Sequence, residues 1–244
     1  MRKFLLGTVG LVALGIAAPA LAADLPARTY TKAPAYVAAV YDWSGFYIGI
    51  NGGWGQSRDR RIDPTGAFIS SLDANGGTVG GQIGYRWQSG AWVYGVEAQG
   101  NWADINGSTI VPGTPAATAR SKMDAFGLFT GQIGYSWNSA LLYVKGGASI
   151  TDRNYQFVTT AGGIVAAETG YQTRLGGTVG AGFEYGFTPN WSAAIEYDHI
   201  FENRHGVTYG SVVGPFPGSS AGGDTDLITA RLNYRWGGPI VAKY

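Results

Sequence analysis

Three features are scarce in this sequence, and each scarcity excludes a class of protein or site. Cysteine is absent from all 244 residues, which excludes disulfides and thiolate metal sites. Charged residues make up only 14% of the chain and the formal net charge is +1, so there is no basic excess that would attract nucleic acid. After residue 23, no stretch reaches the ~20 continuous apolar residues that a membrane helix needs.

Glycine and aromatic residues are abundant instead. The chain contains 40 glycines, and 14% of its residues are aromatic. Typical soluble domains carry about 7% glycine and about 25% charged residues, so this composition is not that of an ordinary soluble domain. A membrane protein without an apolar helix must be a closed β-barrel, because hydrocarbon leaves no other way to pair the backbone polar groups.

The first 23 residues have the pattern of a secretory signal peptide. Arg2 and Lys3 form a basic start, residues 4–18 an apolar core, and Ala20-Leu21-Ala22 a small-residue cleavage site. The alternative, a retained membrane helix, is disfavoured because the apolar run is short and ends in a processing signature. Removing the two basic residues with the leader makes the net charge of the mature chain slightly negative.

Residues 24–42 are rich in Ala, Pro and Tyr and show no clear period, which indicates an extended periplasmic lead-in. From Trp43 onward, outward apolar or aromatic residues alternate with small or polar ones. This period of two is weak evidence in one segment but strong when repeated. Eight segments carry it, at about 43–56, 77–88, 91–103, 121–137, 140–152, 171–187, 190–202 and 225–236.

The connections between these segments alternate in length. Three are tight turns, at Gln88-Ser89-Gly90, Asn138-Ser139 and Thr188-Pro189-Asn190. Four are long, at roughly 57–76, 104–120, 153–170 and 203–224. Bacterial barrels have short periplasmic turns and longer extracellular loops. The sequence therefore predicts an all-β fold, an eight-stranded antiparallel transmembrane β-barrel over residues 43–236, with a C-terminal tail at 237–244.

A short aromatic motif recurs where strands are expected to end on the periplasmic side. Gly-Tyr-Arg-Trp at 84–87 is echoed at 134–137, 184–187 and 233–236. Amphipathic aromatic rings favour the membrane interface, so we expect one aromatic girdle. Its predicted members are Tyr85, Trp87, Trp92, Tyr135, Trp137, Tyr185, Phe187, Trp191, Tyr234 and Trp236. A soluble β-sandwich is the alternative, but it would place charged residues on its outer face.

The opposite faces of the strands carry charged residues that should point into the lumen. Eight strands leave an interior just wide enough for side chains to fill, and unpaired buried charges are costly, so we expect an ionic network. Its predicted members are Arg86, Glu97, Asp124, Lys145, Arg174, Glu184, Glu196, Asp198, Arg231 and Arg235. Lumen size favours structural filling, and the alternative is a charged path that passes ions or small solutes.

One stretch resembles a known family. Residues 41–49, Tyr-Asp-Trp-Ser-Gly-Phe-Tyr-Ile-Gly, are similar to the opening strand of the small porin-like outer-membrane proteins of alphaproteobacteria, also called outer-membrane immunogenic proteins. Residues 24–34 resemble the mature start of that family, and residues 232–239 its end. The resemblance implies an eight-stranded barrel at the cell surface, with structural, envelope-integrity or host-interaction roles and no catalytic activity.

The C-terminus departs from what barrels usually carry. Barrel-assembly machinery commonly reads an aromatic C-terminal residue of the last strand. Here the last predicted strand ends at Trp236, and the terminal Tyr244 follows a Gly-Gly-Pro break. Outer-membrane lipid and this machinery are the expected partners, and the sequence leaves open which aromatic residue is read.

Motifs for catalysis, metals and cofactors are missing or weak. The glycine-rich residues 49–55 lack the following helix that a phosphate loop requires. His199 and His205 have no metal-ligand spacing, and Asp198 and His199 should point to opposite faces of one strand. The long loops, with Phe216 as an exposed candidate, are the expected surface for an external ligand or host partner.

Three hypotheses follow from these observations. The first is a structural and surface-interaction barrel with a lumen plugged by charged side chains, without cofactor or metal. The second is a small porin-like diffusion channel for ions or small solutes. The third is a lipid-modifying outer-membrane enzyme, which we disfavour because no nucleophile stands beside His199 on its face of the strand.

Overall fold

The computed structural model describes residues 41–62, 68–110, 117–159, 165–202, 205–207, 210–211 and 219–236. All of them lie in one unit, from Ala39 to Tyr244. The predicted signal peptide, most of the lead-in and the C-terminal tail lie outside the described residues, and so do Phe216 and the His205 side chain. Within the described part of the chain, no helix is long and apolar enough to cross a membrane.

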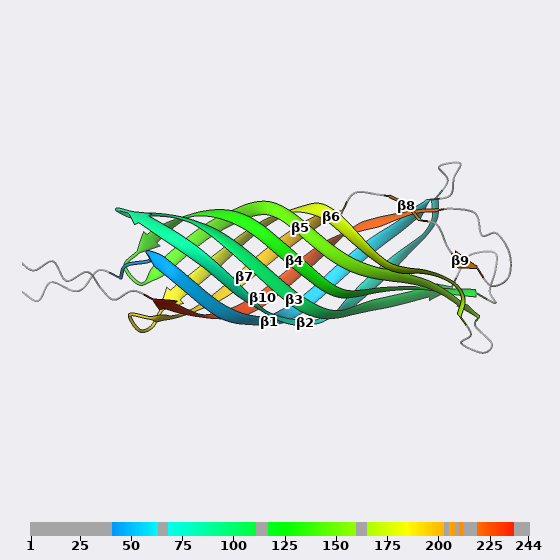
Figure 1. Ribbon diagram of the computed structural model, residues 1–244, viewed down its shortest axis with the longest axis horizontal. Coiled ribbons are helices and arrows are strands. Elements are labelled where there is room, and N and C mark those ends of the chain that lie inside the picture. The colour runs from blue at the N-terminus through cyan, green and yellow to red at the C-terminus, as the bar shows by residue number, and fades with distance from the viewer. Residues whose placement is uncertain are drawn as a thin grey trace, which may run out of the picture. The chain divides into compact units, whose positions relative to one another are not determined.

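Eight long strands form a closed antiparallel ring, as the sequence predicts (Figure 1). Each strand pairs with the next, and β1 pairs with β10 so that Phe46 lies opposite Trp236. Two short strands, His205–Val207 (β8) and Gly210–Ser211 (β9), pair with β10 and β6. The long strands are β1 Gly45–Ile62, β2 Phe68–Ser89, β3 Trp92–Ile110, β4 Ala117–Trp137, β5 Ala140–Thr159, β6 Val165–Gly186, β7 Trp191–Glu202 and β10 Ser219–Trp236.

The three tight turns lie where the sequence predicts them, and we call their side of the barrel the turn end. Gly90 and Asn138 have positive φ angles of 61° and 53°, a backbone region that glycine and asparagine tolerate better than other residues. In the third turn, the backbone N–H groups of Phe187 and Thr188 donate to the carbonyl of Trp191. The opposite side, where the longer connections lie, is the loop end.

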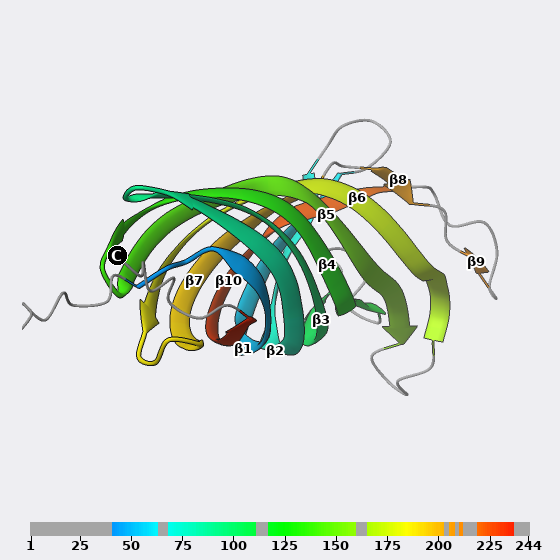
Figure 2. The same ribbon diagram turned by 60° about the vertical axis from the view of Figure 1, so that its left-hand side comes forward.

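Strands extend further toward the loop end than predicted. The residue bounds expected for the four loops are wrong, because β1 continues to Ile62, β2 already begins at Phe68, and every other long strand except β7 extends likewise. Most long strands have 18 to 22 residues, whereas a membrane crossing takes about 9–11. Figure 2 shows β4, β5 and β6 running well beyond β7 toward the loop end.

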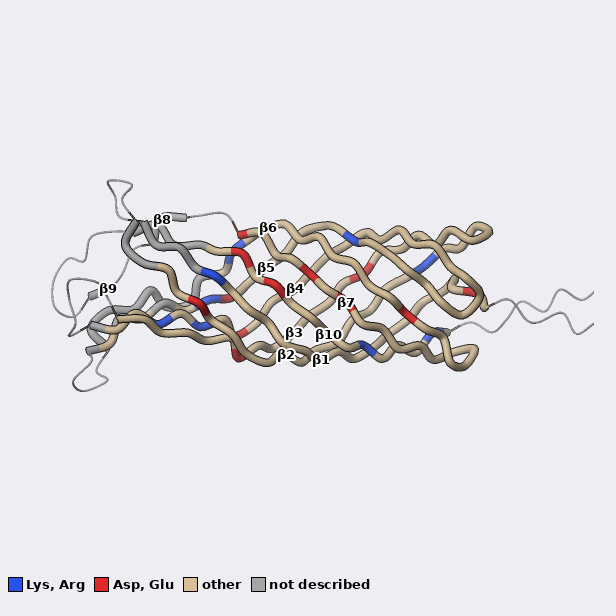
Figure 3. Tube along the Cα trace, turned by 180° about the vertical axis from the view of Figure 1, so that it is seen from behind, with Lys and Arg blue, Asp and Glu red and all other residues tan. Residues whose placement is uncertain are grey.

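Part of the extra strand length escaped prediction because the alternation of polarity reverses along β2, β3, β4 and β10. In the turn-end half of β2, Ile83 faces outward and is 54% exposed, while Gln82 faces inward and is buried. Nearer the loop end of the same strand, Leu72 is buried inside and the Asp73 side chain is exposed outside. Figure 3 shows acidic and basic residues along the whole wall, including this half. A strand that leaves lipid for water must present polar groups outward.

We therefore expect the outward face of β3 to pass from lipid in its turn-end half to water near the loop end. The chain has no cysteine, so single cysteines can be placed without background. An Asp104→Cys variant should react with a membrane-impermeant maleimide on intact cells, because Asp104 is outward and exposed near the loop end. A Val96→Cys variant should react only after unfolding, because Val96 is an outward apolar position in the turn-end half of the strand. Equal labelling of both variants would contradict this boundary.

Candidate functional site in the barrel lumen

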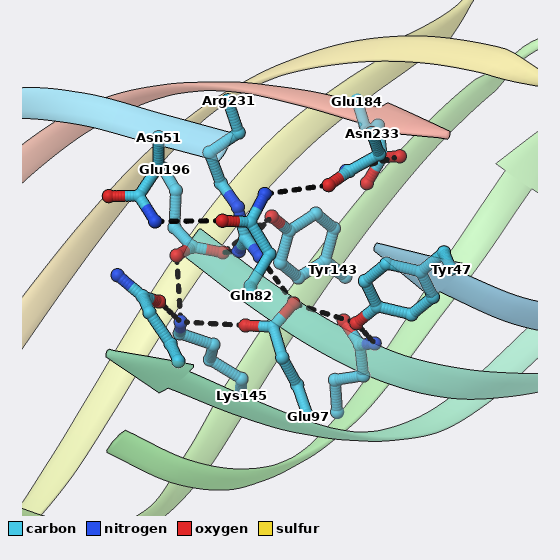
Figure 4. A network of polar contacts seen from close by, with 12 residues as sticks. Tyr47, Asn51, Gln82, Glu97, Tyr143, Lys145, Glu184, Glu196, Arg231 and Asn233 are labelled. Atoms are coloured by element: carbon cyan, nitrogen blue, oxygen red, sulfur yellow. Dashed lines mark hydrogen bonds and ion pairs between the residues drawn. The ribbon is translucent and has the colours of Figure 1, made fainter. Parts of the chain in front are cut away.

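Arg231 on β10 is the centre of a buried ionic network inside the barrel. Its guanidinium forms ion pairs with Glu97 on β3 and Glu196 on β7. The Lys145 ammonium on β5 lies 2.7 Å from Glu196, 3.5 Å from Glu97 and 3.2 Å from Asp198. Figure 4 shows Glu97, Lys145, Glu196 and Arg231 pointing toward one another from different strands. Each of these five side chains is at most 1% exposed, so the pairs are screened from water.

Two tyrosines complete the hydrogen bonding of the glutamates. The Tyr47 hydroxyl donates to Glu97 and the Tyr143 hydroxyl to Glu196, each at 2.6 Å. Both rings lie over glycines, because a Cβ on Gly84 or Gly182 would come within about 2.4 Å of a tyrosine ring or hydroxyl atom. These inward glycines therefore make the room in which large polar side chains cross the lumen.

A second ion pair lies closer to the turn end. Arg86 is 2.8 Å from Glu184, and both side chains are buried. Ser192 and Asn233 also donate hydrogen bonds to Glu184, and the guanidinium of Arg86 stacks 4.6 Å from the Tyr47 ring centroid. Stacking and pairing together satisfy a charge that would otherwise be costly to bury.

The turn end itself is filled by aromatic and aliphatic side chains. Trp43 is 1% exposed and packs in a cluster with Val93, Leu141 and Tyr143, against which Tyr41 also packs. Burial raises the pKa of the Tyr41 hydroxyl above its usual range, so this group is neutral at physiological pH.

Arg235, a predicted member of the network, also lies at this end. Its guanidinium donates to the carbonyl of Pro189 at 2.7 Å and stacks over the Tyr41 ring. It is therefore inward but held mainly by a turn carbonyl and an aromatic ring.

Two other predicted network members do not join the ionic contacts at the centre. The prediction for Asp124 is wrong: it lies at a β-bulge between Met123 and Ala125, is partly exposed, and pairs at 2.7 Å with the exposed Lys122. The bulge shifts the alternation of β4, which a regular period of two cannot anticipate. Arg174 is buried, but it lies farther toward the loop end than the central network. It pairs across the β5–β6 ladder with Thr151, which is six residues along β5 from Lys145.

Sequence reasoning missed a further buried pair toward the loop end. The Arg153 guanidinium donates to Glu202 at 2.9 Å and to the hydroxyls of Thr225 and Ser57 at 2.7 and 3.1 Å. Arg153 was expected in a loop. The inward alternation of Ser149, Thr151 and Arg153 was the signal that could have placed it.

An apolar cluster fills the lumen from the loop-end side of the central network to the level of Arg153. Along β10, Leu227 lies between Arg231 and Thr225, and all three side chains face inward and are buried. Leu227 belongs to a cluster contributed by several strands. Its buried members are Leu72, Ala74, Ile105, Met123, Phe126, Leu128, Ile200 and Leu227. From the turn end to the loop end, the lumen is thus filled first by aromatic side chains, then by the charged network, and then by the apolar cluster, beside which Arg153 is buried.

The predicted aromatic girdle residues all lie at the turn end and face outward, away from the lumen. Neighbouring rings contact one another, as in Trp92 with Tyr135 at 5.4 Å and Trp191 with Tyr234 at 5.1 Å between centroids. Eight of them are well exposed, namely Trp87, Trp92, Tyr135, Trp137, Tyr185, Phe187, Trp191 and Trp236. Tyr85 and Tyr234 are half-buried because they pack against neighbouring rings.

The His199 side chain faces outward, whereas the neighbouring Asp198 side chain faces the lumen and is fully buried. Its Nδ1 lies 2.7 Å from the carboxylate of Asp226, which also accepts a hydrogen bond from Tyr197 at 2.6 Å. Phe201 packs edge-on against the imidazole ring. Across the described strands, no group of three or more His, Asp or Glu side chains is placed to hold a metal ion.

We expect Arg231 to be the most sensitive position of the lumen. Arg231→Met should leave Glu97 and Glu196 short of compensating charge and lower the free energy of unfolding by about 3–5 kcal/mol. The matched control, Lys122→Met, removes an exposed ion pair and should change stability by less than about 1 kcal/mol. Urea unfolding of the barrel refolded in lipid measures both, and similar losses in the two variants would argue against a central role for Arg231.

Comparison with known proteins agrees with this architecture. The 31 kDa outer-membrane immunogenic protein of Brucella melitensis is 29% identical over 199 residues, covering 76% of this chain and 82% of that protein. The 22 kDa outer membrane protein of Rhizobium leguminosarum is 32% identical over 157 residues, covering 64% of this chain and 62% of that protein. Among solved structures, OprG of Pseudomonas aeruginosa superimposes with a TM-score of 0.50 at 14% identity, covering 81% of this chain and all of OprG, which supports the fold alone.

The model of one protein family matches nearly the whole sequence. The match runs over residues 8–236 and so includes every long strand of the barrel. Together with the closed eight-stranded ring and the alphaproteobacterial relatives, it places the protein in the bacterial outer membrane. The chain belongs to the outer membrane protein beta-barrel domain family.

Proposed function

We propose that this protein is a structural and surface-interaction barrel of the outer membrane, with a lumen closed by its own side chains. The observation that carries the proposal is the network centred on Arg231, in which carboxylates and cations from β3, β5, β7 and β10 meet inside the barrel. Removing one partner of a buried pair costs about 3–5 kcal/mol, because a buried charge is left uncompensated, so a rearrangement that unpairs these charges to pass ions is energetically unfavourable.

The apolar cluster supports a closed lumen independently of the charges. Leu128, Ile200 and Leu227 are each 0% exposed and belong to one packed cluster inside the barrel. An ion crossing this section would lose its hydration shell beside these packed apolar side chains. The diffusion channel, our second hypothesis, would need both this cluster and the charged network to rearrange.

The outer surface fits a role in the envelope. Outward aliphatic and aromatic side chains such as Ile83 and Trp87 match a lipid environment, and lipid is the partner along this band. Trp236 ends β10 on the outward face, so we propose it as the aromatic residue that barrel-assembly machinery reads. The Brucella relatives are named immunogenic proteins, which supports a role for the loop end in contacting an external ligand or host surface.

Silent conductance is the first expected result. The refolded mature protein in a planar bilayer should show no stable channel events, and Glu97→Gln should be silent as well, because the amide keeps the lumen filled. Heat-modifiable electrophoretic mobility would verify that each sample is a folded barrel. Stable conductance whose ion selectivity changes in Glu97→Gln would instead establish the diffusion channel.

A catalytic role for His199 is the alternative that lipid analysis tests. His199 has an orienting carboxylate in Asp226, but the neighbouring outward positions on its strand are Tyr197 and Phe201, so no serine nucleophile stands beside it there. Cells producing His199→Ala should have the same lipid profile by mass spectrometry as cells producing the unaltered protein. A lipid species present only with the unaltered protein would refute the non-catalytic proposal.

A further inference from the structure

A polar pocket lies on the outer face of the wall near the loop end. Its volume is about 740 Å³, and its lining comes from β2, β3, β4 and β5. This volume falls in the range of ~300–1,000 Å³ that is typical of small-molecule sites. Along β3, the pocket residue Asn106 lies four residues beyond the outward Trp102, on the side of the loop end where outward residues are polar. The pocket therefore opens toward water outside the lipid band.

Every residue that lines the pocket is polar, charged or glycine. This composition favours a polar occupant over an acyl chain, a steroid or an apolar peptide. Four amide side chains converge on it, from Asn75, Asn106, Asn154 and Gln156. An amide both donates and accepts hydrogen bonds, as a hydroxyl group does, so a row of amides complements a ligand that carries many hydroxyls.

One of these amides has an oxygen atom without a partner. The Asn154 Oδ1 atom is buried and accepts no hydrogen bond from the protein. Buried acceptors are usually satisfied, so a ligand that turned this amide toward the pocket would give the oxygen the donor it lacks.

The charges of the pocket favour an anionic group on that ligand. Asp73 pairs with Arg58 at 3.3 Å and Asp124 pairs with Lys122 at 2.7 Å, so both acids of the lining are compensated. Arg120 is exposed, and the structure gives it no ion pair with any described residue. A guanidinium presents a planar fork that binds carboxylate or phosphate through two hydrogen bonds.

From these observations we propose that the polar pocket binds an acidic oligosaccharide. Its hydroxyls bond to the amides of Asn106 and Asn154, and its carboxylate or phosphate pairs with Arg120. Two sources share this chemistry, the phosphorylated core sugars of the membrane's own glycolipid and a soluble acidic saccharide from outside. The inference rests on the proposed surface role and not on the closed lumen, so failed binding would leave a silent conductance result intact.

Calorimetric titration of the detergent-solubilised barrel tests the proposal. The probes are trigalacturonate, phosphorylated core oligosaccharide released from lipopolysaccharide, and maltotriose as a neutral saccharide of similar length. Arg120→Gln should weaken binding of the acidic probe about tenfold or more, because a charge-assisted contact is lost. Asn154→Leu should weaken it severalfold. The control is Asp224→Asn, which removes an exposed charge that neither lines the pocket nor pairs with a residue of its lining, and should change affinity about twofold at most.

Each outcome has a defined meaning once heat-modifiable mobility has shown that all variants fold. Arg120-dependent binding of trigalacturonate supports the proposal with a soluble ligand. Arg120-dependent binding of the phosphorylated core alone supports it with the membrane's own glycolipid. The proposal is overturned if neither acidic probe binds, if maltotriose binds equally well, or if Asp224→Asn changes binding as much as Arg120→Gln.

Discussion

The pairing of β1 with β10 is the contact on which the rest of the structure depends. In hydrocarbon, an unpaired backbone N–H or C=O group has no water to bond, so a sheet can cross a membrane only when its two edges meet. Here the edges meet along most of both strands, from Phe46 opposite Trp236 to Ile62 opposite Ser220. Closure fixes a narrow interior, and that interior must then be filled or left as a channel.

Filling the interior explains the unusual composition of the chain. Charged side chains from far-apart strands occupy the middle of the lumen, and glycines at their crossing points make room for the tyrosines that bond to them. A lumen filled only by apolar residues would also be closed. Both faces of each strand would then be apolar, because the outward face is already apolar. Polar inward residues keep the alternation that distinguishes the lipid face from the interior.

The solvent outside the wall changes along the barrel axis, and the side chains change with it. Ile228 faces lipid while Thr229 faces the lumen, yet one step toward the loop end Leu227 is inside and Asp226 outside. The same backbone ladder therefore supports two opposite arrangements of polarity. The first suits a membrane protein and the second suits a water-exposed barrel, which is why the loop-end half can have both an apolar core and a polar outer pocket.

What the sequence by itself determined is local in character. The period of two and the turn residues can be read from neighbouring positions in the sequence. They predicted the number of long strands, the three turns, the aromatic girdle and the face of each lipid-side residue. The positions at which strands end toward the loops were misjudged, because the apolar-outward pattern stops at the membrane edge while the ladder continues.

Only the tertiary structure decided which inward groups meet. Arg231 and Glu97 are 134 residues apart, and their contact depends on how far each strand is staggered against the next around the ring. A single bulge in β4 was enough to turn Asp124 away from the lumen, while the stagger brought Arg153 to Glu202. Stagger and bulges are properties of the closed sheet, so no pattern within one strand could specify these contacts.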